Sequence, residues 1–328
     1  MTTLESSKII FYLDDGEFWK ICFADLYKCE DVKIITKSSR FALSNTLKKL
    51  CILHNSTTIN SKFNLPLKSI WNSVDNLILT GNAGKKCFVF TDTSIREVSE
   101  DVLKRLKRNN NKLVMYFLNT LGTDSATDYA MQMVEKRYFY VHFTIYSADA
   151  KKHGFIYCNC CYSKIEHRKT RNLFELTFVG KDKGRVNDLK NIARRTQKIS
   201  SKYYIAEVKT SDMEKIYNVI YNQVLPYQAV LDLVNESRAI LEWVQDGQVG
   251  FSFRIYEAIC YDKILITNNQ FVKKCPFYNE KSMIIIQDSS DDILSILSNA
   301  QNPKYGYCGE YSPIHFVERI KKELLIED

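Results

Sequence analysis

The chain has 328 residues, of which 45% are hydrophobic and 26% charged, a composition typical of a globular protein and not of a disordered or fibrous one. This length is sufficient for two domains. Only 5 prolines and 11 glycines are present, which disfavours a loop-rich all-β architecture. The net charge of +8 indicates either a solvated basic surface or a partner that carries phosphate, such as nucleic acid, an anionic membrane or a diphosphate-linked substrate.

The ten cysteines are scattered along the chain, and several features indicate that they are reduced thiols in the cytoplasm. The segment Met1–Ser7 is polar and the apolar run Ile9–Leu13 is too short for a signal peptide. Cys158, Cys160 and Cys161 lack a second Cys-x-x-Cys pair at zinc-finger spacing, so we expect no metal. No apolar run approaches the length that spans a bilayer, so any membrane contact should be peripheral.

Short apolar runs alternate with helix-like segments, a pattern that predicts α/β layers. In the first half we expect strands at 8–13, 31–36, 76–80, 86–91, 112–119 and 137–146, and helices at 41–53, 97–108 and 125–136. In the second half we expect strands at 173–179, 203–208, 239–244, 264–268 and 283–287, and helices at 186–197, 227–235, 251–260, 291–298 and 314–325. The strand at 173–179 is expected to end at Gly180.

This alternation predicts two Rossmann-like domains that face each other across a cleft. The polar, basic stretch Ser163–Arg171 is the expected linker. The domains should therefore cover residues 1–165 and 166–312. The helix within residues 313–328 is expected to pack back on the first domain.

The most informative segment runs from Gln248 to Ala258 and leads into a helix. Gly250 lets the backbone approach a ligand closely, and the amides at the helix start favour a diphosphate. Arg254 can bind phosphate through two nitrogens, and Glu257 can accept hydrogen bonds from ribose hydroxyls. The alternative is a surface Arg–Glu pair on an ordinary amphipathic helix.

A second segment, Phe178–Arg185, joins a strand to a helix through a glycine-containing turn. Gly180 and Gly184 permit tight backbone geometry, while Lys183 and Arg185 supply positive charge where phosphate would lie. The segment matches neither the Walker pattern nor G-x-G-x-x-G. A plain strand–helix turn is the alternative interpretation.

Three segments, Ser147–Tyr157, Phe178–Arg185, and Gln248–Glu257 with Lys263–Asn269, resemble bacterial glycosyltransferases of lipopolysaccharide core and capsule synthesis. This resemblance implies the GT-B fold, with an acceptor-binding N-terminal domain and a C-terminal domain that binds a nucleotide sugar. It implies that the following residues bind the donor: Gly180, Lys183, Arg185, Gln248, Gly250, Ser252, Arg254, Glu257 and Asn268.

The chain departs from that family at two positions. Relatives usually carry Asp where this chain has Glu242, which is a conservative change. Relatives often have Pro after the Asn that ends a late strand of the first domain, whereas here Thr120 follows Asn119. The second departure weakens any transfer of acceptor-site detail.

The resemblance implies a nucleotide-sugar donor and a glycan or lipid-linked glycan acceptor. The sequence has no D-x-D motif, so we expect no metal or other cofactor, and Arg, Lys and helix amides should stabilise the leaving diphosphate. The basic segment 97–108 and Lys112 suggest contact with an anionic membrane or a lipid-linked acceptor, alongside the alternative of a merely solvated surface.

If transfer inverts the anomeric centre, a base must deprotonate the acceptor hydroxyl. Ligands bind at the carboxyl ends of parallel strands, so carboxylates that follow strands of the first domain are the candidates. Asp14 and Asp15 follow the first strand, and Asp124 follows the strand at 112–119. Because Asp124 precedes a helix, where capping is common, we favour Asp14 or Asp15.

Two other interpretations remain. The dense basic group Lys104, Arg105, Lys107 and Arg108 is compatible with nucleic-acid binding. No recognition module is present and the aromatic residues lie mostly in apolar strands, so we expect no nucleic-acid partner. A catalytically inactive GT-B module that only binds partners is the other alternative.

Overall fold

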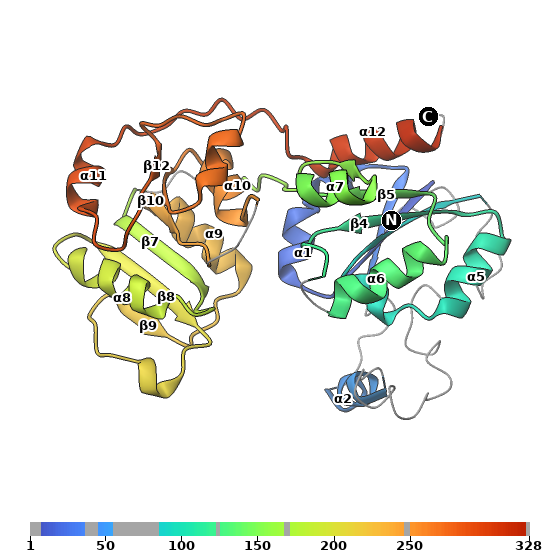
Figure 1. Ribbon diagram of the computed structural model, residues 1–328, viewed down its shortest axis with the longest axis horizontal. Coiled ribbons are helices and arrows are strands. Elements are labelled where there is room, and N and C mark those ends of the chain that lie inside the picture. Colours follow the sequence, from blue (N-terminus) through green and yellow to red (C-terminus); the bar gives the residue numbers. More distant parts are fainter. Residues whose placement is uncertain are drawn as a thin grey trace. The chain divides into compact units, whose positions relative to one another are not determined.

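The structure, a computed structural model, describes residues 8–36, 45–54, 85–122, 125–166, 171–245 and 250–325. The chain divides into two compact units, unit 1 (Met1–Ser163 and Tyr311–Asp328) and unit 2 (Lys164–Glu310). Each unit contains a six-stranded sheet whose described strand pairs are all parallel, with helices packed on it (Figure 1). The predicted α/β class with two Rossmann-like domains is confirmed.

The sheet of unit 1 has the strand order β2-β1-β3-β4-β5-β6. Its strands are β1 (Ile9–Leu13), β2 (Val32–Thr36), β3 (Cys87–Thr91), β4 (Lys112–Phe117), β5 (Val141–Thr144) and β6 (Ile156–Tyr157). Its helices and 3-10 turns are α1 (Glu17–Cys22), η1 (Ala24–Lys28), α2 (Asn45–His54), η3 (Ser94–Glu97), α5 (Glu100–Arg108), α6 (Ser125–Glu135), α7 (Ser147–His153) and α12 (Pro313–Leu324). Every residue of β1 and β3 is buried, as expected for central strands covered on both faces.

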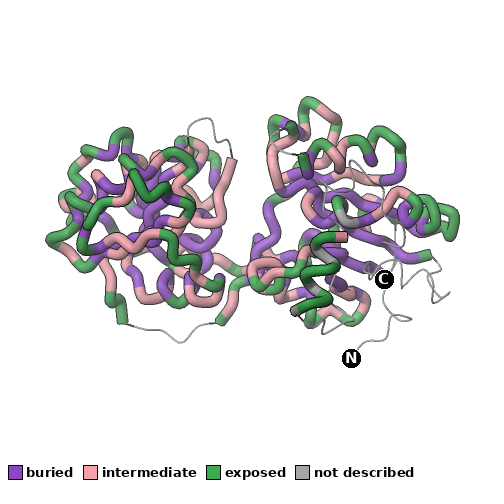
Figure 2. The backbone as a smooth tube through the Cα atoms, turned by 90° about the horizontal axis from the view of Figure 1, so that it is seen from below, coloured by how far each residue is buried: buried purple, intermediate pink, exposed green. Residues whose placement is uncertain are grey.

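The core of unit 1 lies on both faces of this sheet, and the strands are its most buried part (Figure 2). Alternate strand residues point to opposite faces. On one face they join a cluster with α5 and α6, whose members include Phe88, Phe90, Leu113, Met115, Val102, Leu103, Leu106 and Met133. On the other face, residues such as Phe11 and Tyr116 contact α12.

The C-terminal helix α12 therefore belongs to unit 1, although it follows unit 2 in the sequence. Phe316 places its ring centroid 4.4 Å from that of Tyr116 and 5.0 Å from that of Phe143. Ser312 caps the first turn and donates a 2.7 Å hydrogen bond to the Asp25 carboxylate. These contacts fix both the start of the helix and its apolar face.

The sheet of unit 2 has the strand order β12-β11-β10-β7-β8-β9. Its strands are β7 (Phe174–Lys181), β8 (Ser201–Ala206), β9 (Val219–Tyr221), β10 (Ser237–Glu242), β11 (Ile264–Thr267) and β12 (Met283–Ile285). Its helices and 3-10 turns are α8 (Val186–Arg195), η4 (Thr210–Asp212), α9 (Tyr227–Asn235), α10 (Phe253–Cys260), η5 (Gln270–Lys274) and α11 (Ile293–Asn299). The helices α8 and α11 share one apolar cluster with the sheet, whereas α9 and α10 pack against β7, β10 and β11.

Several boundaries differ from the sequence-based expectation. The strand expected to end at Gly180 continues to Lys181, so that prediction was wrong. The helix expected at 97–108 is a 3-10 turn followed by α5, which begins at Glu100 after Ser99. The strand expected at 76–80 lies outside the described residues. None of the described helices is long and apolar enough to cross a bilayer.

We predict that Phe316→Ala destabilises unit 1 by about 3–5 kcal/mol, because it leaves a cavity among buried rings. Hydrogen exchange with mass spectrometry in denaturant should show the loss in peptides of unit 1. Ile314→Ala, at an exposed position of the same helix, is the matched control and should change little. Equal protection in the Phe316 variant and the wild type would contradict the packing role of α12.

Candidate functional site

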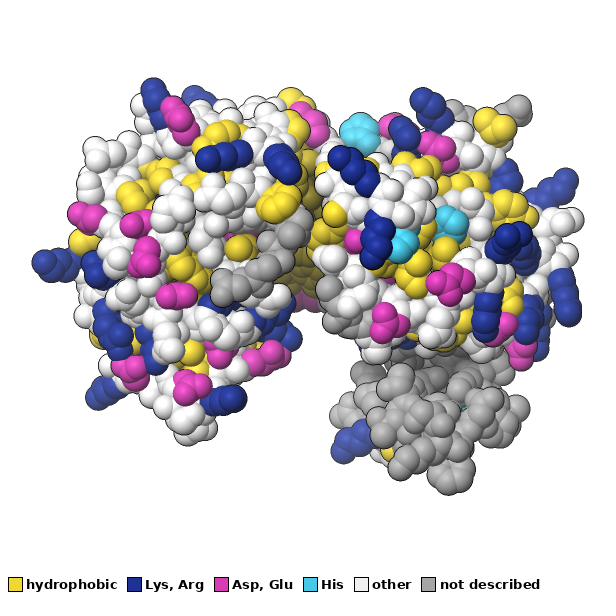
Figure 3. All heavy atoms as spheres, in the orientation of Figure 1, with side chains coloured by type: hydrophobic (Ala, Val, Ile, Leu, Met, Phe, Trp, Pro, Cys, Tyr) yellow, Lys and Arg dark blue, Asp and Glu magenta, His cyan; other side chains and the backbone are white. Residues whose placement is uncertain are grey.

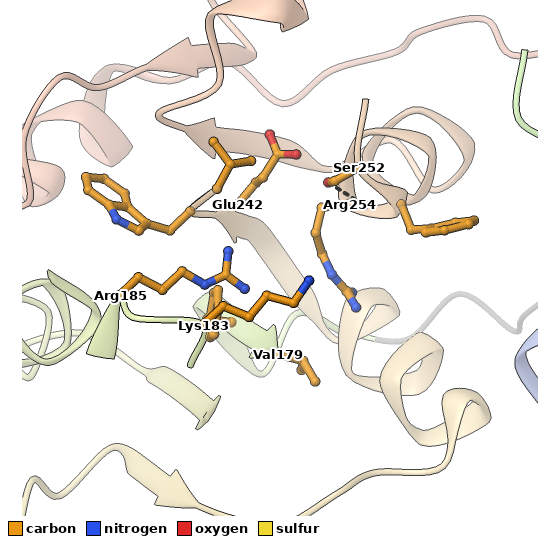
Figure 4. A pocket seen from close by; sticks show the side chains of 10 residues that line it. Val179, Lys183, Arg185, Glu242, Ser252 and Arg254 are labelled. Carbon is orange, nitrogen blue, oxygen red and sulfur yellow. Dashed lines mark hydrogen bonds between the residues drawn. The ribbon is translucent and has the colours of Figure 1, made fainter. Parts of the chain in front are cut away.

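A cavity of about 190 Å³ lies at the carboxyl ends of β7 and β10 in unit 2. From the β9 edge, the strand order of this sheet is the 3-2-1-4-5-6 order of dinucleotide-binding folds, and β7 and β10 are strands 1 and 4. The chain crosses over in opposite directions on either side of this pair, which leaves a crevice outside the strand ends. The lining residues are Phe178, Val179, Lys183, Arg185, Glu242, Trp243, Val244, Ser252, Phe253 and Arg254 (Figure 4).

The turn after β7 carries two of the three cations in this cavity. Lys183 and Gly184 have φ of 47° and 82°, so the chain reverses sharply just before α8. The Asp182 carboxylate accepts a 2.7 Å hydrogen bond from the amide of Val186 and thereby fixes the first turn of α8. The exposed Lys183 side chain therefore lies in a turn that is fixed by β7 on one side and by the first turn of α8 on the other.

Arg185 is held in place by its own strand. Its guanidinium lies over the ring of Phe178, 5.6 Å from the centroid, and Nη2 donates a 3.0 Å hydrogen bond to the carbonyl of Lys181. Gly180 makes this arrangement possible, because a Cβ there would lie 2.8 Å from Cζ of Phe178 and 3.1 Å from Nη2 of Arg185. Glycine is therefore required for close packing of a cation, and not for ending the strand.

The third cation, Arg254, lies at the start of α10 and is fixed by a buried carboxylate. Ser252 caps the helix by accepting a 3.1 Å hydrogen bond from the amide of Arg254. The Arg254 guanidinium pairs with Oε2 of Glu257, which is completely buried, while the hydroxyl of Tyr227 donates a 2.8 Å hydrogen bond to Oε1. Burial raises the pKa of Glu257, and the charge of Arg254 opposes that rise.

This geometry changes the role of Glu257. Helical spacing alone predicted a carboxylate on a polar face, available to ribose hydroxyls. In the structure both of its oxygens are engaged and it does not line the cavity. The cause is Tyr227, thirty residues earlier on α9, which makes a buried position for the carboxylate favourable. Glu257 therefore positions Arg254, and the pair is not the surface pair of the alternative interpretation.

The carboxylate that does line the cavity is Glu242, the last residue of β10. Its side chain is buried, and Oε2 accepts a hydrogen bond from the hydroxyl of Thr267. Within the described part of the chain, Oε1 has no hydrogen-bond partner. Burial raises the pKa of Glu242, while the nearby side chains of Ser252, Thr267 and Asn269 and the Arg185 cation act in the opposite direction.

Two asparagines after β11 shape the loops around the cavity. The side chain of Asn268 accepts a 2.7 Å hydrogen bond from the amide of Val244 and donates one to its carbonyl. The next residue, Asn269, donates a 3.0 Å hydrogen bond to the carbonyl of Gly250, whose φ is 97°. Asn268 and Gly250, both predicted donor-site residues, therefore support the lining without being part of it.

The sequence-based candidates in unit 2 fall into three groups. Lys183, Arg185, Ser252 and Arg254 line one cavity. Gly180, Gly250, Glu257 and Asn268 support the lining residues, and Gln248 lies outside the described residues. The sequence analysis missed most of the apolar lining and did not place Glu242 in the site. The available signal for Glu242 was its position near the carboxyl end of the strand expected at 239–244, since ligands bind at the carboxyl ends of parallel strands.

The arrangement suits a ligand that carries phosphate. Figure 4 shows the cationic ends of Arg185, Lys183 and Arg254 on the same side of the cavity. The amides at the N-terminus of α10 add positive potential. A cavity of about 190 Å³ accommodates a diphosphate and its immediate neighbours, and is smaller than the ~300–1,000 Å³ typical of whole-ligand pockets. Among residues 8–36, 45–54, 85–122, 125–166, 171–245 and 250–325, no cluster of His, Cys, Asp and Glu could hold a metal ion.

In unit 1, Asp14 and Asp15 follow β1 and lie at the carboxyl edge of the sheet, as the sequence predicted. Asp14 is half-buried and Asp15 is exposed. The neighbouring strand β3 is followed directly by another carboxylate, Asp92, which the sequence had not indicated. Asp124, the third predicted candidate, lies outside the described residues.

Asp92 is fully buried and organises the loop that follows β4. Its Oδ2 accepts hydrogen bonds from the amides of Leu118 and Asn119, at 3.2 and 2.9 Å, and from the side chain of Asn119. Burial raises the pKa of Asp92 to about 6, and these hydrogen bonds limit the rise. Because its oxygens are occupied by backbone donors, Asp92 supports the edge where Asp14 and Asp15 lie.

Comparisons with protein-family models and with curated protein sequences found no match. Solved structures match in fold. An α-glucosyltransferase in complex with UDP and a 13-mer DNA containing a HMU base is 10% identical, with 98% of this chain and 100% of that chain covered and a TM-score of 0.52. The β-glucosyltransferase of phage T4 is 10% identical, with 96% and 99% covered and a TM-score of 0.50. The likeness is one of fold, and the two α/β units have the GT-B fold of glycosyltransferases.

We predict that Gly180→Ala weakens the binding of inorganic diphosphate about tenfold, because the added Cβ displaces Arg185 or the Phe178 ring beneath it. Isothermal titration calorimetry measures the affinity. Gly16→Ala in unit 1, where a Cβ would meet Trp19 at an ordinary 3.6 Å, is the control and should bind as the wild type does. Undiminished affinity in Gly180→Ala would mean that Arg185 does not contact the anion.

Proposed function

We propose that the protein is a glycosyltransferase whose nucleotide-sugar donor binds at the cavity of unit 2. The observation that carries this proposal is the convergence of Lys183, Arg185 and Arg254 with the start of α10 at the switch point of a Rossmann-like sheet. Cations and helix amides are the groups that bind a diphosphate. The GT-B fold supports the same activity, because the matched structures are glycosyltransferases.

In this reaction the three cations would stabilise the charge of the leaving diphosphate. During transfer the bond between the anomeric carbon of the sugar and the diphosphate oxygen breaks, and the electron pair leaves with the nucleoside diphosphate. A new bond forms between the anomeric carbon and an acceptor oxygen. The charge that develops on the leaving oxygen must be stabilised, and fixed guanidinium and ammonium groups do so without reorganisation. We propose that transfer needs no metal, because the chain has no D-x-D motif.

Removing a cation of the cavity should weaken donor binding. We expect Lys183→Ala and Arg254→Ala each to weaken nucleoside diphosphate binding about 10–100-fold, measured across UDP, GDP, ADP and CDP in EDTA and again with magnesium or manganese. Arg254→Ala also leaves the buried Glu257 without its cation and should therefore lower the stability of the fold as well. Because Lys183 is exposed, Lys183→Ala should change nucleotide affinity without changing stability.

Arg194→Ala is the matched control, because it removes the same charge from an exposed ion pair with Glu214 that does not line the cavity. It should bind nucleotides as the wild type does. The donor-site proposal would be overturned if no nucleotide bound the wild type, or if Lys183→Ala and Arg254→Ala both bound normally. A requirement for magnesium or manganese would overturn metal independence.

For the acceptor we propose a surface polysaccharide or lipopolysaccharide glycan at the inner face of the membrane. The resemblance of three segments to enzymes of lipopolysaccharide core and capsule synthesis supports this choice. Lys and Arg side chains also gather over the α5 edge of unit 1, where Arg105 and Arg108 are exposed (Figure 3). Such a surface favours anionic partners.

DNA is the alternative acceptor, and one specific observation favours it: a matched structure was solved with DNA. The same basic α5 surface would suit a phosphate backbone. Sugar transfer to a lipid-linked glycan and to duplex DNA that contains hydroxymethyl pyrimidines separates the two. Transfer to DNA alone would overturn the polysaccharide proposal.

For transfer with inversion, we propose that Asp14 or Asp15 takes the proton from the acceptor hydroxyl. Both lie at the carboxyl edge of the unit 1 sheet, beside the β1–β3 switch point. We expect Asn substitution at one of Asp14, Asp15 or Asp124 to lower kcat at least about 100-fold while nucleotide affinity is kept.

Asp101→Asn is the control for these variants, since Asp101 is an exposed carboxylate of α5 and should tolerate the change. The rates are measured in the steady state at saturating donor and acceptor, with both acceptor classes. Normal rates in all three Asn variants would place the base elsewhere or indicate transfer with retention.

A further inference from the structure

One oxygen in the proposed donor cavity is buried but unsatisfied. Glu242 is 3% exposed, and its Oε2 is occupied by the hydroxyl of Thr267. In the part of the chain that the structure describes, Oε1 has no partner. A buried acceptor without a hydrogen bond is destabilising, and such groups are uncommon in folded proteins. Because Glu242 lines the cavity, a ligand group there can satisfy this oxygen.

The charges around the cavity limit what that group can be. The other charged lining residues are the three cations, Lys183, Arg185 and Arg254. A diphosphate satisfies them, but it carries only acceptor oxygens and negative charge. Placed at an ionised Glu242, it would face a like charge and leave Oε1 without a donor. The ligand atom at Glu242 must therefore belong to a different part of the ligand.

The cavity has two chemically distinct ends. The carboxylate of Glu242 is directed toward Ser252, whereas the cationic tips of Lys183, Arg185 and Arg254 gather below it (Figure 4). The Ser252 oxygen accepts the amide of Arg254, and its hydroxyl proton can be donated to the neighbouring Glu242 carboxylate or to a ligand. An acceptor beside a hydroxyl group is the recognition pair that suits a ligand hydroxyl, which both donates and accepts.

We propose that Glu242 is a specificity-determining residue whose Oε1 accepts a hydrogen bond from a hydroxyl of the donor, adjacent to the phosphates that the three cations hold. This inference rests on the proposed donor site. The hydroxyl belongs either to the ribose or to the transferred sugar, and both present the same chemistry.

Glu242→Gln tests the proposal with almost no change of shape. The carboxamide oxygen can keep the hydrogen bond from Thr267, while its NH2 group replaces Oε1 and turns an acceptor into a donor. The probes are inorganic diphosphate, UDP, 2′,3′-dideoxy-UDP and UDP-glucose, with the base changed to the one that the wild type prefers. We expect the variant to bind inorganic diphosphate at least as tightly as the wild type, because a negative charge near the cations is removed.

The same variant should bind hydroxyl-bearing ligands about tenfold or more weakly, because their donor group now meets another donor. A loss for UDP that disappears with dideoxy-UDP assigns the ribose. A loss for UDP-glucose alone assigns the transferred sugar. Binding of inorganic diphosphate shows in each case that the cavity is folded.

Equal effects of Glu242→Gln on all four probes would overturn the proposal. Unchanged binding of all four would do so too, since that result is expected if a protonated Glu242 donates to phosphate. Glu242→Asp is the second variant, because it keeps the charge and withdraws the oxygens by one methylene. It should weaken only the hydroxyl-bearing ligands. Failure of the wild type to bind any nucleotide would instead reject the donor site itself.

Discussion

The burial of the Glu257 carboxylate is the constraint on which the architecture of unit 2 depends most directly. An ionised carboxylate that has left water must be compensated by hydrogen bonds and by an opposite charge. Tyr227 on α9 and Arg254 on α10 supply these, so one buried group ties together two helices that are distant in sequence. It also fixes the direction of the guanidinium that reaches the cavity. Stability and site geometry are therefore set by the same three side chains.

The buried carboxylates of Glu257 and Glu242 in unit 2 have different roles, one in stabilising the fold and the other in the proposed binding of a ligand. Both oxygens of Glu257 have partners within the unit, so this residue completes the fold. Glu242, which lines the cavity, has one oxygen held by Thr267 and one that has no partner among the described residues. Proteins tolerate such an unsatisfied group where a ligand will complete it. The sequence does not reveal this difference, because each of the two glutamates lies in or next to a run of apolar residues.

Local sequence signals predicted the fold well. The helix at Tyr227–Asn235 begins and ends where its periodicity indicated, and the apolar runs that form β1 and β3 are strands. These features depend on residues within one turn or one strand of each other.

The parts that could not be predicted depend on partners far along the chain. Gly180 was expected to end a strand, but its absence of a side chain accommodates Arg185 and Phe178 instead. Asp92 gains its role only because β4 brings Asn119, twenty-seven residues later, within hydrogen-bond reach. Glu257 is buried because of Tyr227. The spacing of residues within a segment does not reveal such contacts. For this reason the sequence identified Gly180 and Glu257 but not their supporting roles, and it did not identify Asp92.

The return of α12 to unit 1 has a consequence for the order in which the protein matures during translation. Domains generally fold as units, with the N-terminal one first as the chain emerges from the ribosome. Unit 2 has its whole sheet once residue 310 has been synthesised, whereas the face of unit 1 that Phe316 covers must wait for residues 313–324. Until then Phe11, Tyr116 and Phe143 lack the ring that shields them. Unit 1 is thus the first to be synthesised and the last to be completed, and its nascent sheet is the surface that a chaperone would have to protect.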